Sequence, residues 1–322
     1  MTWRIGVDIG GTFTDAALVN EETSEIGIAK TLTTPGDFGE GVVNALKQAI
    51  EAYSVPPDTV SLLSHATTVV TNAILEEKGA RTALIATRGF RDILELRRSS
   101  RADLYDMFQD PPAILVPRHR RLEITERIDA QGDVVIPLAQ DEIDQIVEEI
   151  KALNVDAVAV SLLFSFLNDS HERTLGEALR AALPETPVFL SSEVLPEIRE
   201  FERTSTTAVC AYVGPILDSY LSRLEEAVSG LNLPPLHVMG SAGGVVDVPE
   251  AIRMPAAVVE SGPAAGVIAA ALVGEQIGQS NLLSFDMGGT TAKASLICEG
   301  TIETTAEYEV GGGEGSQNRW LH

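Results

Sequence analysis

The stretch that decides the fold is Val7-Asp8-Ile9-Gly10-Gly11-Thr12-Phe13-Thr14-Asp15-Ala16-Ala17-Leu18-Val19. The same pattern returns as Phe285-Asp286-Met287-Gly288-Gly289-Thr290-Thr291-Ala292-Lys293-Ala294-Ser295-Leu296-Ile297, at a constant offset of 278 residues. Each copy has the pattern of an apolar strand, an Asp-x-Gly-Gly-Thr turn and a second apolar strand. A repeat at a fixed offset predicts two related halves.

The turn of each copy has the chemistry of a phosphate site. Consecutive glycines expose backbone N–H groups that can surround an anion, and the threonine hydroxyl adds a donor. Asp8 and Asp286 would instead hold Mg²⁺ that bridges the phosphates. A single turn of this kind is also an ordinary hairpin, because glycine admits the positive φ of tight turns. The second copy favours the phosphate interpretation, with these predicted cofactor contacts: Gly10, Gly11, Thr12, Thr14, Gly288, Gly289, Thr290 and Thr291.

The composition excludes several other classes of protein. The 322 residues carry 47 acidic and 23 basic side chains, which gives a net charge of −24, and 44% are hydrophobic. This apolar content supports real cores, and the negative charge opposes binding to nucleic acid or membrane surfaces. Two separated cysteines give no disulfide or zinc pattern. Without a signal peptide pattern or a long apolar stretch, we expect a cytoplasmic protein with no membrane span.

Strand and helix patterns alternate along the chain, which predicts the α/β class. A boundary near Pro184–Pro187 predicts two domains, residues 1–186 and 187–322, with the second hairpin starting at about 281. Gly79 is expected to follow the end of the second helix as its C′ residue. The expected helices are 37–52, 67–78, 141–153, 171–183 and 203–228. The expected strands are 60–65, 82–87, 155–166, 187–190 and 236–239.

His65 stands between a strand and a threonine-rich helix start. Thr67 and Thr68 can cap that helix and leave N–H groups open to an anion, with Asn72 one turn further along. These residues are candidates for contacts with a substrate or a γ-phosphate. The alternative is a capped helix and a histidine whose hydrogen bonds are satisfied within the core.

Three further features have both a functional and an ordinary explanation. Arg91 belongs to a group of arginines (Arg88, Arg91, Arg97, Arg98 and Arg101) that could attract an anionic substrate or form salt bridges with Asp92 and Glu95. The Gly262–Gly266 turn opens a helix of small residues that serves close packing or, at its N-terminus, a phosphate. Cys210 has no neighbouring histidine and is expected in the core.

The sequence also resembles the hydantoinase A/5-oxoprolinase family over essentially its whole length. The segments that carry the resemblance are Ser64–Glu76, Lys78–Leu84, Thr87–Asp92, Tyr212–Pro215, Gly240–Gly244, Ser261–Gly266 and Phe285–Lys293. The two hairpins resemble the phosphate motifs of the actin, Hsp70 and sugar-kinase superfamily. The resemblance implies an actin-like (ribonuclease H-like) ATPase architecture whose second half is incomplete, since family members continue well past His322. The chain is therefore expected to be an N-terminal fragment.

The resemblance implies an ATP- and Mg²⁺-dependent hydrolase of cyclic amides such as hydantoin, N-methylhydantoin or 5-oxoproline. ATP would phosphorylate a carbonyl oxygen, and a hydantoinase B-type subunit and an oligomer are expected. Asp8, Asp286 and His65 would be catalytic, and His65, Thr67, Thr68, Asn72 and Arg91 would face the substrate. The alternatives are an acetone or acetophenone carboxylase subunit and an inactive fragment that only binds nucleotide.

Lys293 departs from the family pattern, which often has aspartate there as in Thr14-Asp15. It either marks a subgroup or contacts phosphate itself, which would leave Asp8 as the main metal ligand.

Overall fold

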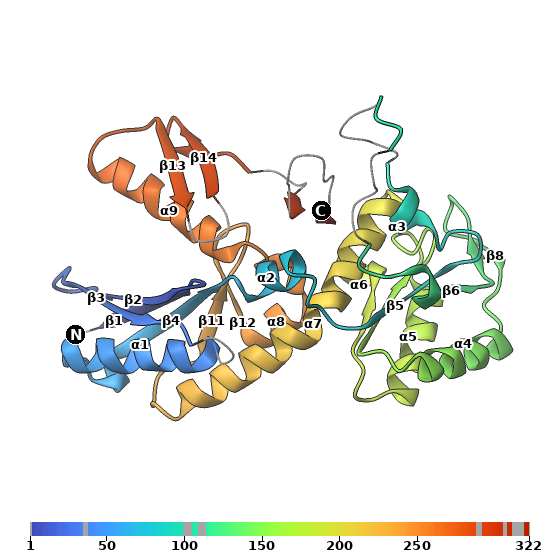
Figure 1. Ribbon diagram of the computed structural model, residues 1–322, viewed down its shortest axis with the longest axis horizontal. Coiled ribbons are helices and arrows are strands. Elements are labelled where there is room, and N and C mark those ends of the chain that lie inside the picture. The colour runs from blue at the N-terminus through green and yellow to red at the C-terminus, as the bar shows by residue number, and fades with distance from the viewer. Residues whose placement is uncertain are drawn as a thin grey trace. The chain divides into compact units, whose positions relative to one another are not determined.

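The computed structural model describes residues 2–34, 38–98, 105–108, 114–287, 292–304, 308–310 and 319–321. It is a mixed α/β structure, as predicted, whose contacts divide the chain into two compact units (Figure 1). Unit 1 comprises Met1–Asn72 and Leu217–Thr305, and unit 2 comprises Ala73–Ile216 and Ala306–His322. The division falls within helices α2 (Val69–Leu75) and α7 (Glu200–Ser229). The two units therefore interleave along the chain, whereas the predicted boundary near residue 186 concerns family domains and stays a prediction.

Unit 1 is built on a six-stranded sheet in the order β12-β11-β4-β1-β2-β3. β1, β2 and β3 form an antiparallel meander, β4 and β11 extend it in parallel, and β12 closes the edge antiparallel. Alternate residues of the first strand, Ile5, Val7 and Ile9, are buried, as the period of two requires. The strands are Trp3–Ile9 (β1), Phe13–Asn20 (β2), Ile26–Leu32 (β3), Val60–Thr67 (β4), Leu236–Met239 (β11) and Val245–Asp247 (β12).

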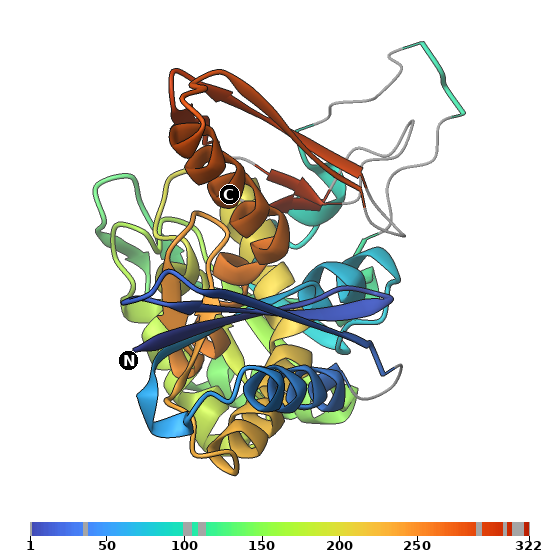
Figure 2. The ribbon, with the colours of Figure 1, turned by 90° about the vertical axis from the view of Figure 1, so that its left-hand side faces the viewer.

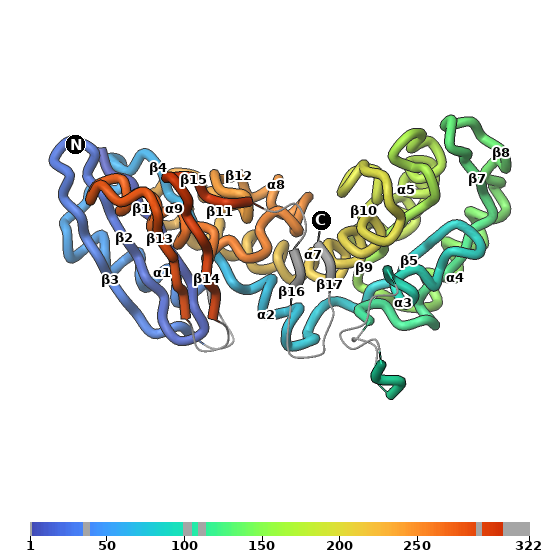
Figure 3. The backbone as a smooth tube through the Cα atoms, turned by 90° about the horizontal axis from the view of Figure 1, so that it is seen from above, coloured from blue at the N-terminus to red at the C-terminus, as the bar shows by residue number. Residues whose placement is uncertain are grey.

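Helices cover both faces of this sheet. α1 (Phe38–Ala52) packs on β1, β2 and β3, and α9 (Ser261–Gln276) packs on β4 and β11 from the other side (Figure 2). α9 also contacts a second, three-stranded sheet formed by β13 (Leu282–Met287), β14 (Ala292–Cys298) and β15 (Thr301–Ile302). Seen from above, the β13–β14 hairpin and α9 lie over β1 and β2 (Figure 3). The two repeats of the sequence are therefore the two hairpins β1–β2 and β13–β14.

Unit 2 contains a four-stranded parallel sheet in the order β10-β9-β5-β6. Helices α4 (Gln140–Leu153) and α5 (Ser170–Ala182) bury their apolar stripes against it, with Ile146 and Leu175 in one continuous core. The strands are Thr82–Thr87 (β5), Arg121–Ile124 (β6), Ala157–Ser161 (β9) and Val188–Leu190 (β10). The remaining elements of unit 1 are η1 (Pro57–Thr59), α8 (Val248–Arg253) and η3 (Pro255–Val258). Those of unit 2 are α3 (Ile93–Leu96), η2 (Arg118–Arg120), β7 (Arg127–Ile128), β8 (Val134–Ile136) and α6 (Ser191–Val194). The last two strands of the chain are β16 (Tyr308–Val310) and β17 (Arg319–Leu321).

The helix expected at 67–78 is shorter than predicted, and Gly79 is not its C′ residue. β4 continues through Thr67, and α2 ends at Leu75. Glu77 adopts the left-handed conformation (φ 55°), and the N–H groups of Glu77 and Lys78 bond to the carbonyls of Ile74 and Ala73 at 3.3 and 3.0 Å. This is the Schellman arrangement, so Glu77 occupies the C′ position.

Gly79 is required for packing instead. A Cβ there would lie 2.0 Å from the ring of Tyr212 on α7, so glycine lets the chain pass against that ring.

Other expectations about strands, helices and core residues had different outcomes. The apolar run expected as one strand over 155–166 contains a shorter strand, β9, whose residues are all buried, as predicted. The helix expected over 203–228 is present as α7, which contains Pro215, and Cys210 is fully buried, so both expectations are confirmed. Across the described residues, no helix is both long enough and apolar enough to cross a membrane.

Candidate nucleotide-phosphate site

The turn of the first hairpin joins β1 to β2 through Gly10, Gly11 and Thr12. The Gly10 N–H donates to the carbonyl of Phe13 at 2.9 Å, and a Cβ on Gly10 would lie 3.2 Å from that same oxygen. Neither Gly10 nor Gly11 has a positive φ, so the expectation of left-handed glycines in this turn is wrong. A Cβ at position 10 would crowd this tight turn, and at position 11 nothing lies within 4 Å of a built Cβ.

Thr33 supports this turn from the end of β3. Its backbone N–H bonds to the carbonyl of Thr12 at 3.0 Å, and its hydroxyl donates to the carbonyl of Gly10 at 2.8 Å. Thr14 is fully buried, and its hydroxyl lies 3.1 Å from that of Thr33. Thr14 was predicted to contact the nucleotide, but in this structure its hydroxyl braces the turn from within.

Asp8 and Asp286 lie near each other although 278 residues separate them. The pKa of Asp8 is raised to about 6, first by burial of its carboxylate and then by the negative charges of Asp15 and Asp286. The residue keeps contact with solvent, but protein atoms surround its carboxylate closely enough for desolvation to be the largest cause. The start of α9 lies beside it, since a Cβ on Gly262 would lie 3.4 Å from Asp8 Oδ1.

Lys293 forms an ion pair with Glu260, the residue that precedes α9. Burial lowers the pKa of the Lys293 ammonium to about 8. Glu260 has a left-handed backbone (φ 64°), and its N–H donates to the Thr71 hydroxyl at 3.3 Å. The cation of the second hairpin is therefore directed toward the start of α9.

The donor set of this site suits Mg²⁺ with a nucleotide. Among the described residues, no group of three or more His, Cys, Asp and Glu side chains could hold a metal ion by itself. Mg²⁺ characteristically takes one or two carboxylates and completes its shell with phosphate oxygens and water. Asp8 and Asp286 could provide those carboxylates, and the exposed backbone at Gly11 and Thr12 could present N–H groups to an anion. The second turn, Gly288, Gly289, Thr290 and Thr291, lies outside the described residues.

Thr67 and Thr68 join the first strands to the rest of unit 1. The fully buried Thr67 accepts a hydrogen bond from the Val69 N–H at 3.1 Å, as the predicted cap would. The Ser261 hydroxyl accepts from the Thr67 N–H and donates to its carbonyl, both at 3.1 Å. Thr68 donates to the carbonyl of Ile9 at 3.1 Å, and the Asn72 amide lies 3.5 Å from the Thr68 hydroxyl. These hydrogen bonds connect β1, α2 and α9 next to Asp8.

His65 lies in the core of unit 1 and does not reach solvent. Its Nδ1 lies 3.2 Å from the carbonyl of Val7, and its Nε2 lies 2.7 Å from the hydroxyl of Tyr220 on α7. Burial lowers the pKa of the ring to about 4, so His65 is neutral, donates from Nδ1 and accepts from Tyr220 at Nε2. Both ring nitrogens are used within the protein, so this geometry gives no support to a substrate contact by His65.

Arg91 belongs to unit 2 and pairs with Glu123 at 3.5 Å. Arg88 pairs with Glu142 and Arg98 with Glu202, as the salt-bridge alternative predicted, although the partners differ from those expected. Asp92 and Glu95 instead bind two other arginines, Arg118 and Arg121. Arg101 lies outside the described residues.

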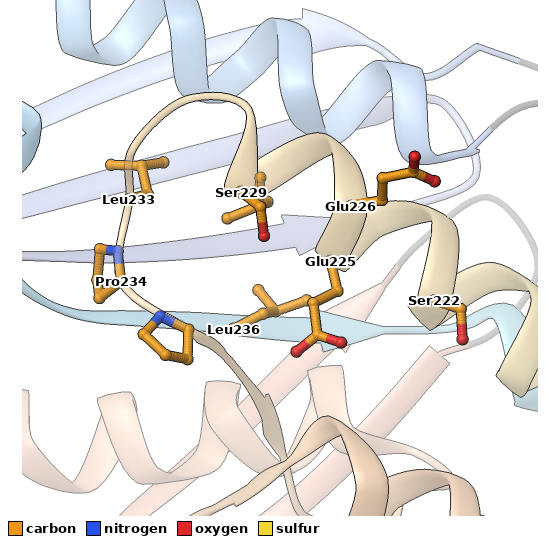
Figure 4. Close-up of a pocket in the computed structure, with 9 residues that line it drawn as sticks. Ser222, Glu225, Glu226, Ser229, Leu233, Pro234 and Leu236 are labelled. Carbon is orange, nitrogen blue, oxygen red and sulfur yellow. The ribbon is translucent and has the colours of Figure 1, made fainter.

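A surface cavity of about 400 Å³ lies elsewhere in unit 1, between the end of α7 and the loop before β11 (Figure 4). Leu233, Pro234 and Leu236 form its apolar wall, and Glu225 and Glu226 stand on the helix side. None of the predicted site residues lines it.

Sequence reasoning missed four supporting residues. Thr33 had no signal, because it lies 21 positions after the turn it braces. Lys30, Glu260 and Tyr220 belong to other elements, and only the fold brings them to the hairpins and to His65. The segment Ser261–Gly266 was noted, and its alternative role at a phosphate is consistent with the position of Gly262 beside Asp8.

Comparison with known proteins defines the class. Residues 4–183 match the model of the hydantoinase/oxoprolinase N-terminal region, and residues 203–319 match the hydantoinase/oxoprolinase model. The chain belongs to the hydantoinase/oxoprolinase family, which confirms the resemblance in its sequence.

Three relatives show the range of the family. The caprolactamase subunit alpha of Pseudomonas jessenii is 35% identical over 91% of the chain and 43% of its own length. The structure of ATP-dependent caprolactamase from that organism gives a TM-score of 0.78 with the same coverage and 34% identity. A nucleotide-free acetone carboxylase gives a TM-score of 0.84 at 26% identity, covering 99% of this chain and 46% of that one. The 5-oxoprolinase 1 of Arabidopsis thaliana is 29% identical over 96% of the chain and 26% of its own length. The chain thus spans less than half the length of these relatives.

Proposed function

We propose that this chain is the nucleotide-binding part of an ATP-dependent enzyme that opens cyclic amides of the hydantoin, N-methylhydantoin or 5-oxoproline type. The observation that carries the proposal is the proximity of Asp8 and Asp286, one from each copy of the repeated hairpin. Two related halves that meet at the phosphates are the arrangement of actin-like ATPases, and the antiparallel meander followed by parallel strands in unit 1 is consistent with it.

In this proposal Asp8 and Asp286 hold Mg²⁺, and the backbone N–H groups of Gly11 and Thr12 bind phosphate, while the Gly10 N–H closes the turn by its bond to the Phe13 carbonyl. Gly288, Gly289, Thr290 and Thr291 take the equivalent part in the second hairpin. Bound Mg·ATP supplies a phosphoryl group that turns a stable amide carbonyl into an electrophile. The contribution of these residues is positioning and charge neutralisation, as in phosphoryl transfer generally.

The substrate side of the proposal rests on Thr68 and Asn72, which lie next to the end of β1. A hydantoinase B-type subunit would complete the enzyme, since the caprolactamase relative is named as one subunit of a larger protein.

Calorimetry with Mg·ATP tests the nucleotide site. Asp8→Asn and Asp286→Asn should each weaken binding by about tenfold or more, because each removes a charged metal ligand. Asp58→Asn, which removes an exposed carboxylate in η1 of the same unit, is the matched control and should bind like the wild type. Full affinity in both hairpin variants would exclude this site.

A ketone carboxylase subunit is the second candidate, and the TM-score of 0.84 with acetone carboxylase favours it. ATP hydrolysis stimulated by hydantoins or 5-oxoproline supports the cyclic amide hydrolase. Stimulation only by ketones with bicarbonate would replace it with the carboxylase, and nucleotide binding without any stimulation would indicate a binding module.

A further inference from the structure

The two hairpins have a similar arrangement of charged residues. In the register of β1 and β2, Asp8 stands directly opposite Asp15, and in β13 and β14 Asp286 stands directly opposite Lys293. Asp15 is held by Lys30 of β3 at 2.8 Å. In the second hairpin, Lys293 is held by Glu260. In each hairpin, the residue opposite the turn-proximal aspartate is therefore bound by a charge from a third element.

Neither turn-proximal aspartate, Asp8 or Asp286, forms an ion pair with any other residue that the structure describes. For Asp286 this absence needs a cause, because directly opposite residues on one face of an antiparallel pair have their Cβ atoms about 4.5–5.5 Å apart. A lysine in that position would ordinarily neutralise the carboxylate across from it.

Glu260 has the geometry to prevent that pairing. Its side chain is only 12% exposed, and that of Lys293 is 22% exposed, so water screens the pair weakly. The Glu260 backbone is fixed by its bond to Thr71, and the next residue, Ser261, is fixed by two bonds to Thr67. The Glu260 carboxylate thus extends from a backbone that these hydrogen bonds hold in place at the start of α9.

We propose that Glu260 is a positioning residue that holds the Lys293 ammonium away from Asp286, so that the Asp286 carboxylate remains available to a divalent cation. In the first hairpin Asp15 is itself an acid and cannot form an ion pair with Asp8, so Lys30 only offsets part of the Asp15 charge. This inference rests on the proposed Mg·ATP site and adds to it the reason why a lysine can occupy the position that is aspartate in the first repeat.

The test is Mg·ATP binding to the protein at its natural length, measured by calorimetry. Glu260→Gln keeps the length of the side chain and removes its charge, so Lys293 is released toward Asp286. We expect affinity to fall by about fivefold or more. Glu275→Gln, which removes an exposed carboxylate from the same helix, should bind like the wild type.

The decisive variant is the double substitution Glu260→Gln with Lys293→Met. If the released lysine is what blocks Asp286, removing it should recover most of the affinity that Glu260→Gln loses. A double variant as weak as Glu260→Gln would overturn the inference, because Glu260 would then serve the local structure or Lys293 would itself bind phosphate. A wild-type protein that binds no Mg·ATP would overturn the proposed function and this inference with it. Wild-type binding without rescue would overturn the inference alone.

Discussion

At the scale of single residues, Asp8 couples the site to pH. Its pKa is raised to about 6 from a usual value of 3.8, so the folded protein holds this proton at pH values where the unfolded chain has lost it. The Asp8 contribution to stability is therefore fully present below the unfolded pKa and is lost as pH rises through about 6. Asp8→Asn should remove this loss.

The measurement is the difference in Tm between Asp8→Asn and the wild type without ligand. The difference should grow in favour of the variant between about pH 4 and about pH 7, by roughly 2–4 °C for each kcal/mol of relieved desolvation and repulsion. Asp58→Asn controls for the loss of a charge. A difference that stays constant over this range would mean that the Asp8 carboxylate is neither desolvated nor repelled by its neighbours.

The environment of His65 gives a second prediction, which distinguishes a structural role of this residue from a role in nucleotide binding. Tyr220→Phe leaves the buried Nε2 of His65 without its donor, and an unsatisfied buried acceptor costs about 1–3 kcal/mol of the free energy of unfolding. Urea unfolding measures this cost. Tyr53→Phe, which loses a hydroxyl bonded to Ile28 at an exposed position, should cost about 0.5 kcal/mol or less.

Mg·ATP affinity provides the other half of this test. Because the His65 ring is buried and both of its nitrogens bond within the protein, the affinity of Tyr220→Phe should remain near that of the wild type. If Tyr220→Phe kept its stability but lost affinity for Mg·ATP, His65 would instead have a role in the nucleotide site.

The sequence could predict the aspartates but not what surrounds them. Asp8 and Asp286 are recognisable because each lies inside a repeated local pattern, and chemistry selects carboxylates for Mg²⁺. His65 could not be assigned from the same information, since a core histidine and a ligand-binding histidine differ only in what the fold places against them. Tyr220 lies 155 positions away, and no local pattern connects the two.

At the scale of elements, close packing against Tyr212, and not a turn conformation, explains why residue 79 is glycine. Gly79→Ala would place a methyl group 2.0 Å from the Tyr212 ring, and overpacking of this kind costs about 1–3 kcal/mol. The matched control is Gly266→Ala in α9, where nothing lies within 4 Å of the added Cβ and helix propensity favours alanine by about 1 kcal/mol. Denaturant unfolding should therefore show opposite signs for the two variants.

A second substitution identifies the cause of the Gly79 effect. If the clash is with the ring, Tyr212→Leu should reduce the cost of Gly79→Ala in a double-mutant cycle, since the two residues are in contact. Strictly additive effects would show that the backbone at Gly79, and not the ring, sets the requirement for glycine.

The predicted elements show the same division between local and distant information. The amphipathic helices α4 and α5 lie where the 3.6-residue period placed them, because that period is a local property. The limits of β4 and α2 were misplaced because Thr67, a plausible helix cap, is held in the sheet by its register with Ile9 and by Ser261, which is 194 residues away. Tertiary bonds decided between two conformations that the local sequence allows.

At the scale of the whole molecule, the charge of −24 sets a condition on any nucleotide site. A field of this sign repels Mg·ATP, which is itself an anion, before the nucleotide reaches the turn. The proposed site must overcome that repulsion with short-range groups, namely backbone N–H groups and a divalent cation held by two aspartates. The long-range field of the protein therefore repels Mg·ATP, whereas the short-range groups of the site attract it.

This opposition predicts how Mg·ATP association depends on salt. Raising the ionic strength from about 0.01 M to about 0.15 M shortens the screening length from about 30 Å to about 8 Å, which removes most of the distant repulsion. Contacts within the site are screened much less, because they act over a few ångströms. Stopped-flow measurements with a fluorescent ATP analogue and excess Mg²⁺ should show the association rate constant rising by about twofold or more, with little change in the dissociation rate constant. Most protein sites that bind anions through clustered basic residues show the reverse, since salt weakens their attraction. An association rate constant that falls with salt would show that a local positive field governs approach to the site.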